Sequence, residues 1–104
     1  MSETITFVTC KDPTEARKIA AALVREKLAA CGNILPGITS IYRWEGRVER
    51  GRECLLLLKS RDSLSKRLAA RVRALHSYSV PEVVTVRIAS GNPAYLRWVR
   101  ESTR

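Results

Sequence analysis

A single long β-hairpin, predicted between Cys31 and Ser60, limits the folds open to this sequence more than any other feature. Two strand-forming runs, residues 31–44 and 47–60, flank a turn at Glu45-Gly46. Each arm has about 14 residues and would extend about 45 Å. A compact domain of this length has a radius of gyration of about 13 Å. We therefore expect the turn to project, and because an isolated ribbon is marginal in water, we expect another chain to cover it.

The length and composition fit one domain, assigned to residues 1–104. Hydrophobic residues make up 45% of the chain, enough for a core at this size. The longest apolar runs, residues 19–24 and 54–58, are far shorter than a membrane span, and the N-terminal residues do not resemble a secretory leader. We expect a soluble cytoplasmic protein without membrane contact.

Cysteine usage also favours the cytoplasm. Cys10, Cys31 and Cys54 are an odd, widely spaced set without a CxxC pair. This pattern argues against a disulfide framework and against a structural zinc knuckle.

The net charge of +9 does not by itself predict a nucleic-acid-binding protein. Basic residues are dispersed, and between Arg43 and Glu53 arginines alternate with glutamates, which is typical of solvated, paired charge. RNA binding on a sheet of this kind needs stacking aromatics on the first and third strands, and Phe7 is the only one there. Nucleic acid is therefore not an expected partner, although the net charge can attract polyanions weakly.

Local patterns predict the first strand and helix. Residues 4–10 are rich in β-branched and aromatic types, which favours a strand. Asp12, followed by Pro13 and Glu15, predicts a helix start with Asp12 as its N-cap. The apolar positions spaced three or four apart predict the buried face of this helix: Ala16, Ile19, Ala20, Leu23, Val24 and Leu28.

The rest of the chain also contains strand and helix signals. Pro36-Gly37 predicts a bulge or a bend in the second strand, and the apolar run 54–58 predicts burial of the third strand on both faces. Asp62 or Ser60 is expected to cap a second helix that ends near His76. A fourth strand over residues 82–89 and a short helix capped by Asn92 complete the pattern.

This order predicts an α+β, ferredoxin-like fold, βαββαβ with a short C-terminal helix. We expect an antiparallel sheet with the first and third strands in the centre and two helices on one face. The opposite face must then meet solvent, a third helix or another subunit. Together with the long hairpin, this favours an oligomer.

The residues alone nominate no catalytic site. His76 is the only histidine, and a histidine at a helix C-terminus usually interacts with the helix dipole or packs in the core. No acidic partner at a recognisable spacing supports a hydrolytic triad, and the chain has no Walker A loop or GxGxxG. We therefore expect no enzyme.

Four strings carry a resemblance that covers almost the whole chain: EKLAACGNILPGITSIYRWEG, LLLLKS, LHSYSVPEV and GNPAYLRWV. In this order and spacing they resemble the CutA divalent-cation tolerance family. The resemblance implies a ferredoxin-like protomer and a homotrimer assembled through sheet edges and the long hairpin. It also implies high thermal stability, a cytoplasmic or organellar location and an association with copper and other divalent metals.

The resemblance also implies a metal site. Cys10 matches one copper ligand proposed for the family, and His76 matches one of two adjacent histidines. Leu75 stands where the other histidine would be. Copper or another divalent metal is therefore the expected ligand, and no organic cofactor is expected.

A second site implied by the resemblance is a cleft between subunits. The matching positions are Tyr42, Trp44, Lys59, His76, Tyr78, Glu82 and Trp98. Aromatic walls with one cation and one carboxylate would suit a small polar ligand. Alternatively, Trp44, Tyr78 and Trp98 are packing anchors of a subunit interface, where aromatics are enriched.

Two functional hypotheses follow. The first is a trimeric, non-enzymatic, cytosolic protein that binds metal ions and contributes to metal tolerance. The alternative is a trimeric sensor, similar to PII-type signalling proteins, that binds a small molecule in the clefts between subunits.

Overall fold

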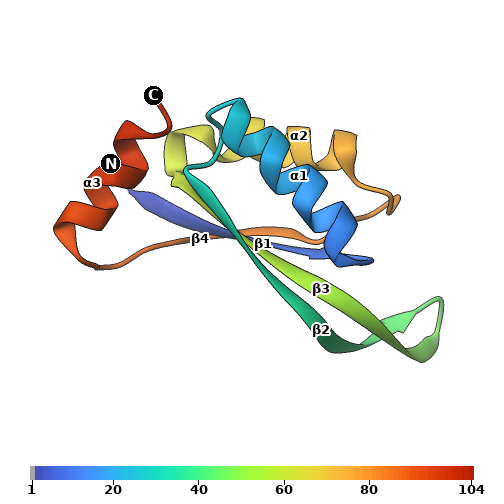
Figure 1. The fold of residues 1–104 in the computed structure, drawn as a ribbon. Helices are drawn as coiled ribbons and strands as arrows, with labels where there is room; N and C mark the ends of the chain where they lie inside the picture. Colours follow the sequence, from blue (N-terminus) through green and yellow to red (C-terminus); the bar gives the residue numbers. More distant parts are fainter. Residues whose placement is uncertain (1) are drawn as a thin grey trace.

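The computed structural model describes residues 2–104, and its elements follow the predicted order (Figure 1). They are β1 (Glu3–Cys10), α1 (Pro13–Arg25), β2 (Cys31–Trp44), β3 (Arg47–Arg61), the 3-10 turn η1 (Asp62–Leu64), α2 (Ser65–Leu75), β4 (Val83–Arg87) and α3 (Pro93–Glu101). The strands form one antiparallel sheet in the order β2-β3-β1-β4. The prediction that the first and third strands are central is confirmed.

One face of the sheet is covered by α1 and α2, and the core lies between this face and the two helices (Figure 1). Side chains alternate along β1, so that Val8 and Cys10 are fully buried while the neighbouring Phe7 is only half-buried. The register places Val8 opposite Leu56 and Cys10 opposite Cys54. All four of these buried residues therefore point toward the helices.

The other face, which α1 and α2 leave bare, is called the open face here. It is formed by alternate apolar residues of β1, β3 and β4: Ile5, Phe7, Leu55, Leu57, Val84 and Val86. The prediction that residues 54–58 are buried on both faces is wrong for the single chain, because Leu55 and Leu57 are only half-buried. The helices can shield one face of a strand, and its alternate side chains point away from them.

Helix α1 begins as predicted and ends earlier than predicted. Asp12 accepts a hydrogen bond from the backbone of Glu15 at 2.9 Å, which confirms it as the N-cap. The helix stops at Arg25, and Lys27 lies in the left-handed region with φ of 62°. Leu28 is therefore buried beyond the helix, and Val24 is 41% exposed, so its predicted place on the buried face is wrong.

The predicted cap of the second helix is also wrong. The 3-10 turn comes first, and no side chain caps either it or α2. Ser60 donates instead to the carbonyl of Leu28 at 2.7 Å, and Asp62 pairs with Arg87. In contrast, Asn92 accepts from the backbone of Ala94, as predicted for the cap of α3.

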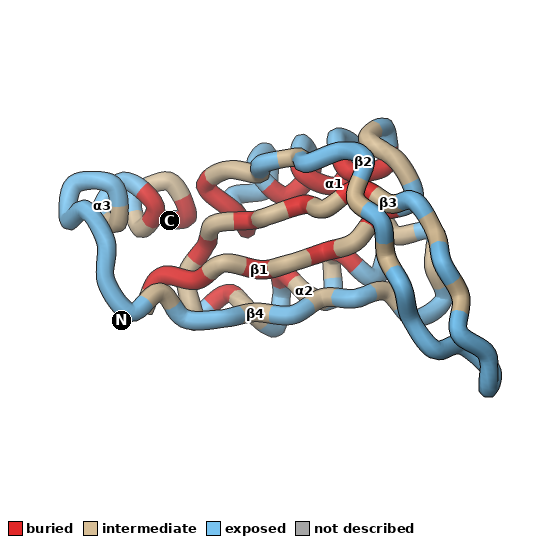
Figure 2. Tube along the Cα trace, turned by 90° about the horizontal axis from the view of Figure 1, so that it is seen from below, coloured by how far each residue is buried: buried red, intermediate tan, exposed pale blue. Residues whose placement is uncertain are grey.

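The hairpin of β2 and β3 projects from the domain, as its length predicted (Figure 1). The molecule extends 44 × 25 × 23 Å, and the residues near the hairpin turn are exposed (Figure 2). The register shifts between Leu35 and Ile38, where Gly37 has a φ of 75°, so the predicted bulge is confirmed.

None of the helices within residues 2–104 is long and apolar enough to cross a membrane. The three cysteines are free thiols: Cys10 and Cys54 are buried, and Cys31 is half-buried.

Candidate functional site

Three side chains of types that can ligate a metal converge where β1 ends and α1 begins. Cys10 is the last residue of β1, Glu15 lies in the first turn of α1, and His76 follows α2 directly. One ligand atom from each lies within 4.8 Å of the other two. We call these three residues the donor cluster. The sequence-based resemblance supplied Cys10 and His76 and missed Glu15, whose position in the first turn had been assigned to helix capping alone.

Backbone hydrogen bonds hold the carboxylate of Glu15. Its Oε1 accepts from the backbone N–H of Lys11 at 3.1 Å, and its Oε2 accepts from that of Ser77 at 2.8 Å. Glu15 therefore fastens the segment after α2 to the start of α1. Burial alone would raise the pKa of Glu15, but the hydrogen bonds from Ser77 and Lys11 outweigh burial and lower it below its usual value.

Both ring nitrogens of His76 also have partners. Nδ1 accepts from the backbone N–H of Tyr78 at 3.1 Å, so the ring proton lies on Nε2, which donates to the carbonyl of Thr9 at 2.8 Å. The His76 side chain is fully buried, and its Nδ1 lies 3.9 Å from Oε2 of Glu15. The imidazole thus has a fixed tautomer and a fixed orientation.

The thiol of Cys10 is kept protonated. Burial, followed by the nearby charge of Glu15, raises the pKa of Cys10 to about 12. A metal ion bound here would have to displace the thiol proton, because the thiolate is the metal-ligating form.

The donor cluster fits a metal in its chemistry. A thiol, an imidazole and a carboxylate together suit copper, zinc and similar ions better than the hard cations magnesium and calcium. An ion can bind Nδ1 of His76 only if it displaces the backbone N–H of Tyr78, which donates a hydrogen bond to that nitrogen. The neighbouring Leu75 has no ligand atom and packs against the core, so the cluster offers three side-chain donors from one chain.

A pocket of about 730 Å³ lies next to the donor cluster. Residues that line it include Thr9, Tyr42, Trp44, Glu53, Tyr78 and Glu82. Its floor belongs to the open face, because Thr9 and Glu53 alternate with the buried Cys10 and Cys54. The prediction missed Glu53, although its spacing of two from Leu55 would have placed it on this face.

Tyr78 connects the pocket to the donor cluster. Its backbone N–H donates to His76, and the centroid of its ring lies 4.7 Å from that of the His76 ring. Its hydroxyl donates to Oε2 of Glu53 at 2.7 Å. Burial and the bond to Glu53 raise the pKa of Tyr78. The phenol is therefore a hydrogen-bond donor at neutral pH.

The structure divides the predicted cleft into two groups. Tyr42, Trp44, Tyr78 and Glu82 line the pocket, whereas His76, Lys59 and Trp98 do not.

Lys59 lies six residues along β3 from Glu53, about 20 Å away, where its ammonium donates to Asn33. Trp98 is on α3, with its ring 5.6 Å from that of Tyr95. A cleft that unites both groups needs a second chain, and it stays a prediction.

Comparisons with known proteins agree with this fold. A family model described as CutA1 divalent ion tolerance protein matches residues 4–102. The divalent-cation tolerance protein CutA of Thermus thermophilus is 52% identical over 101 residues, which cover 97% of this chain and 98% of that protein. A solved structure of the divalent cation tolerance protein (Cut A1) from Thermus thermophilus has a TM-score of 0.95 at 51% identity, covering 98% of this chain and 99% of that one.

A plant relative is longer. Protein CutA, chloroplastic, of Arabidopsis thaliana is 46% identical over 100 residues, which are 96% of this chain and 55% of that protein. The chain therefore spans nearly all of the Thermus relative and about half of the plant one. The predicted α+β fold, with one four-stranded antiparallel sheet and three helices, is confirmed and matches the solved Thermus structure.

Proposed function

The chain belongs to the CutA1 divalent ion tolerance family, as the resemblance of its motifs predicted, and we propose that it acts by binding a divalent metal ion rather than by turnover. The donor cluster is the proposed site, and copper or zinc is the proposed ligand. The observation that carries the proposal is the convergence of Cys10, Glu15 and His76 within 4.8 Å.

Charge supports a divalent ion over a monovalent one. When the thiol of Cys10 gives up its proton, the cluster holds a thiolate, the carboxylate of Glu15 and the neutral ring of His76. A divalent ion would balance these two negative charges, whereas a monovalent ion would leave one charge uncompensated. Because all three side chains are buried or nearly so, an uncompensated charge would be costly.

Metal titration tests this proposal. Cobalt(II) and zinc(II) are titrated into the protein under reducing conditions, with affinity measured by competition against a chromophoric chelator. We expect one ion per chain, release of about one proton per ion from the Cys10 thiol, and a thiolate-to-cobalt absorption band. Cys10→Ser should abolish the band, and His76→Ala should weaken binding at least tenfold.

Cys31→Ser is the matched control, because it removes a thiol outside the donor cluster. It should bind metal as the unsubstituted protein does. An absence of saturable binding, or equal losses in Cys31→Ser and Cys10→Ser, would refute the proposal.

We also propose a cytoplasmic homotrimer that is assembled through sheet edges and the long hairpin, with the open face covered by a neighbouring subunit. The open face supports an assembly, because Val84 and Val86 are 50% and 45% exposed and share this face with the half-buried Leu55 and Leu57. Free thiols suit a reducing compartment, although the Arabidopsis relative is named chloroplastic. Light scattering should give three times the chain mass of 11.7 kDa, and a monomer at all concentrations would contradict this assembly.

A sensor of small molecules is the second candidate function. The pocket of about 730 Å³ supports it, since its size and its mixture of aromatic and carboxylate residues are typical of ligand sites. A thermal-shift screen separates the candidates. Metabolites that raise the melting temperature of the metal-free protein, and lose this effect in Glu82→Gln, would favour the sensor. Stabilisation by metals alone would reject it.

A further inference from the structure

Several arginine side chains line one hollow beside α3. Helix α3 and the chain termini lie at the end of the molecule opposite the hairpin turn (Figure 1). Arg61, Arg97, Arg100 and Arg104 line this hollow of about 300 Å³, with Glu101 as the one acidic residue among them. We call these four residues the arginine cluster. It shares no residue with the donor cluster or with the pocket beside it.

Arg61 is the fixed member of the cluster. Its Nε donates to Oγ1 of Thr103 at 3.0 Å, one terminal nitrogen donates to the carbonyl of Thr103 at 2.7 Å, and the other donates to Ser63 at 3.2 Å. Thr103 is itself buried and donates to the carbonyl of Val99. The guanidinium plane is therefore held in place before any ligand arrives.

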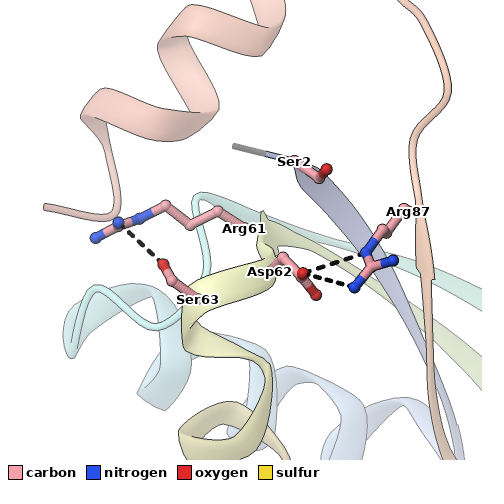
Figure 3. Close-up of a pocket in the computed structure, with 5 residues that line it drawn as sticks. All are labelled: Ser2, Arg61, Asp62, Ser63 and Arg87. Carbon is pink, nitrogen blue, oxygen red and sulfur yellow. Dashed lines mark hydrogen bonds and ion pairs between the residues drawn. The ribbon is translucent and has the colours of Figure 1, made fainter.

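The contacts of Arg61 leave its charge without a carboxylate. Figure 3 shows its guanidinium turned away from Asp62, which pairs with Arg87. Within residues 2–104 no acidic group lies in ion-pair distance of Arg61. Three of its five N–H groups are used by neutral oxygens, so two remain to donate.

The rest of the cluster also carries an excess of positive charge. Arg100 pairs with Glu3 at 3.0 Å, whereas Arg97 and Arg104 have no ion pair with the described residues. Four arginines thus face two side-chain carboxylates, Glu3 and Glu101, which leaves a local side-chain charge of +2. The hollow therefore favours an anion.

We propose that the arginine cluster binds a phosphoryl group, either as inorganic phosphate or as the phosphate of a small monoester. Guanidinium groups match phosphate oxygens in geometry and remain charged at all physiological pH values. A phosphoryl group carries about −1.5 to −2 charges near pH 7, which complements the local excess. The hollow is at the lower end of the size range of small-molecule sites, so it fits a phosphate with a small organic substituent.

The proposal predicts local recognition rather than attraction by the net charge of +9. Binding of inorganic phosphate and of AMP is measured by calorimetry on metal-free protein at fixed ionic strength, so that the outcome does not depend on the metal site. The double variant R97A/R104A should bind the tighter of the two probes at least tenfold more weakly. These two arginines are exposed and form no ion pair with the described residues, so the fold should be retained, which circular dichroism checks.

The double variant R47A/R50A is the matched control. It also removes two positive charges, but from the arm of the hairpin at the other end of the molecule. It should bind like the unsubstituted protein. Arg61→Lys provides a second measurement, because it keeps the charge and loses the planar fork, and it should weaken phosphate binding while R47A/R50A does not.

Each outcome decides the proposal. Equal affinities for phosphate and AMP identify the free anion, and tighter AMP binding identifies a monoester. No saturable binding of either probe would overturn the proposal. Equal losses in R97A/R104A and R47A/R50A would also overturn it, because they would show that only the overall field attracts anions.

Discussion

Replacing Glu15 by alanine should destabilise the protein strongly, although Glu15 is a charged residue near the start of a helix. The residue is 7% exposed, and its two carboxylate oxygens accept backbone hydrogen bonds from Lys11 and Ser77. Hydrogen bonds to a charged group contribute about 1.5–3 kcal/mol each. Some of this is recovered when water reaches the freed N–H groups, so we expect Glu15→Ala to lower the free energy of unfolding by about 2–4 kcal/mol.

Glu15→Gln and Glu26→Ala bracket this effect. Glutamine keeps the shape of the side chain, but its amide nitrogen would face one of the two N–H donors, so we expect an intermediate loss. Glu26 forms an exposed ion pair with Arg71 at 2.9 Å, and exposed pairs contribute little. Glu26→Ala should therefore remain close to the unsubstituted protein.

The pH dependence provides an independent check. The pKa of Glu15 is lower in the folded state than its ordinary value of 4.5. Its contribution is thus fully present above about pH 5 and is lost as the pH falls through the folded-state pKa. The difference between the unsubstituted protein and Glu15→Ala should shrink as the pH falls below about 5.

Equilibrium unfolding in guanidinium chloride at pH 7 and pH 3.5 measures both quantities. Protein concentration must be held constant, because any assembly makes stability depend on it. A loss below about 0.5 kcal/mol at pH 7, the size of an ordinary surface substitution, would refute the assignment of Glu15 as the fastener of the segment after α2. A loss that is the same at both pH values would refute the role of its charge.

Three further predictions concern the core. Thr4 Oγ1 is buried and has no hydrogen-bond partner within residues 2–104, so Thr4→Val should raise the free energy of unfolding by up to about 1 kcal/mol. In the same denaturation assay Thr6→Val should lower it by about 1 kcal/mol, because it breaks the 2.7 Å hydrogen bond between the hydroxyls of Thr6 and Thr85. A Cβ on Gly32 would lie 2.9 Å from a side chain of α1, so Gly32→Ala should cost about 1–3 kcal/mol, and Gly51→Ala, whose nearest neighbour is at 3.8 Å, should cost less than half of that. Cys10, with its pKa raised to about 12, should resist iodoacetamide at pH 8 in the folded protein and react after unfolding, as measured by mass spectrometry.

The elements of the fold could be predicted because their signals are local. Asp12 and Asn92 mark helix starts through bonds to residues two or three positions away, and Pro36-Gly37 marks the bulge within its own strand. The predicted cap of α2 was wrong because the bonds that decide it are not local. Ser60 and Asp62 have the right chemistry for a cap, but each side chain bonds a partner more than twenty residues away, and such competition leaves no trace in a local pattern.

The site was less predictable because it is built from contacts between distant segments. Cys10 and His76 are brought together by the sheet and by α2, and only the resemblance to a family linked them before the structure. The resemblance to the family pointed to neither Glu15 nor Glu53. Each had an adequate local explanation, one as a helix-capping acid and the other as a charge on the hairpin, although their partners Ser77 and Tyr78 lie on a different segment.

These partners indicate how metal binding could reach the surface of the protein. Ser77 and Tyr78 donate adjacent backbone N–H groups to Glu15 and His76, and the Tyr78 hydroxyl donates to Glu53 in the floor of the pocket. Under the proposed metal function, an ion at His76 Nδ1 deprives the Tyr78 N–H of its acceptor. This N–H is partly buried, and leaving it without an acceptor costs up to about 1–3 kcal/mol. The cost favours a shift of the segment that gives the group another partner. Because Tyr78 also lines the pocket on the open face, where a neighbouring subunit is proposed to pack, occupancy of a buried cluster would alter a surface that another molecule can contact.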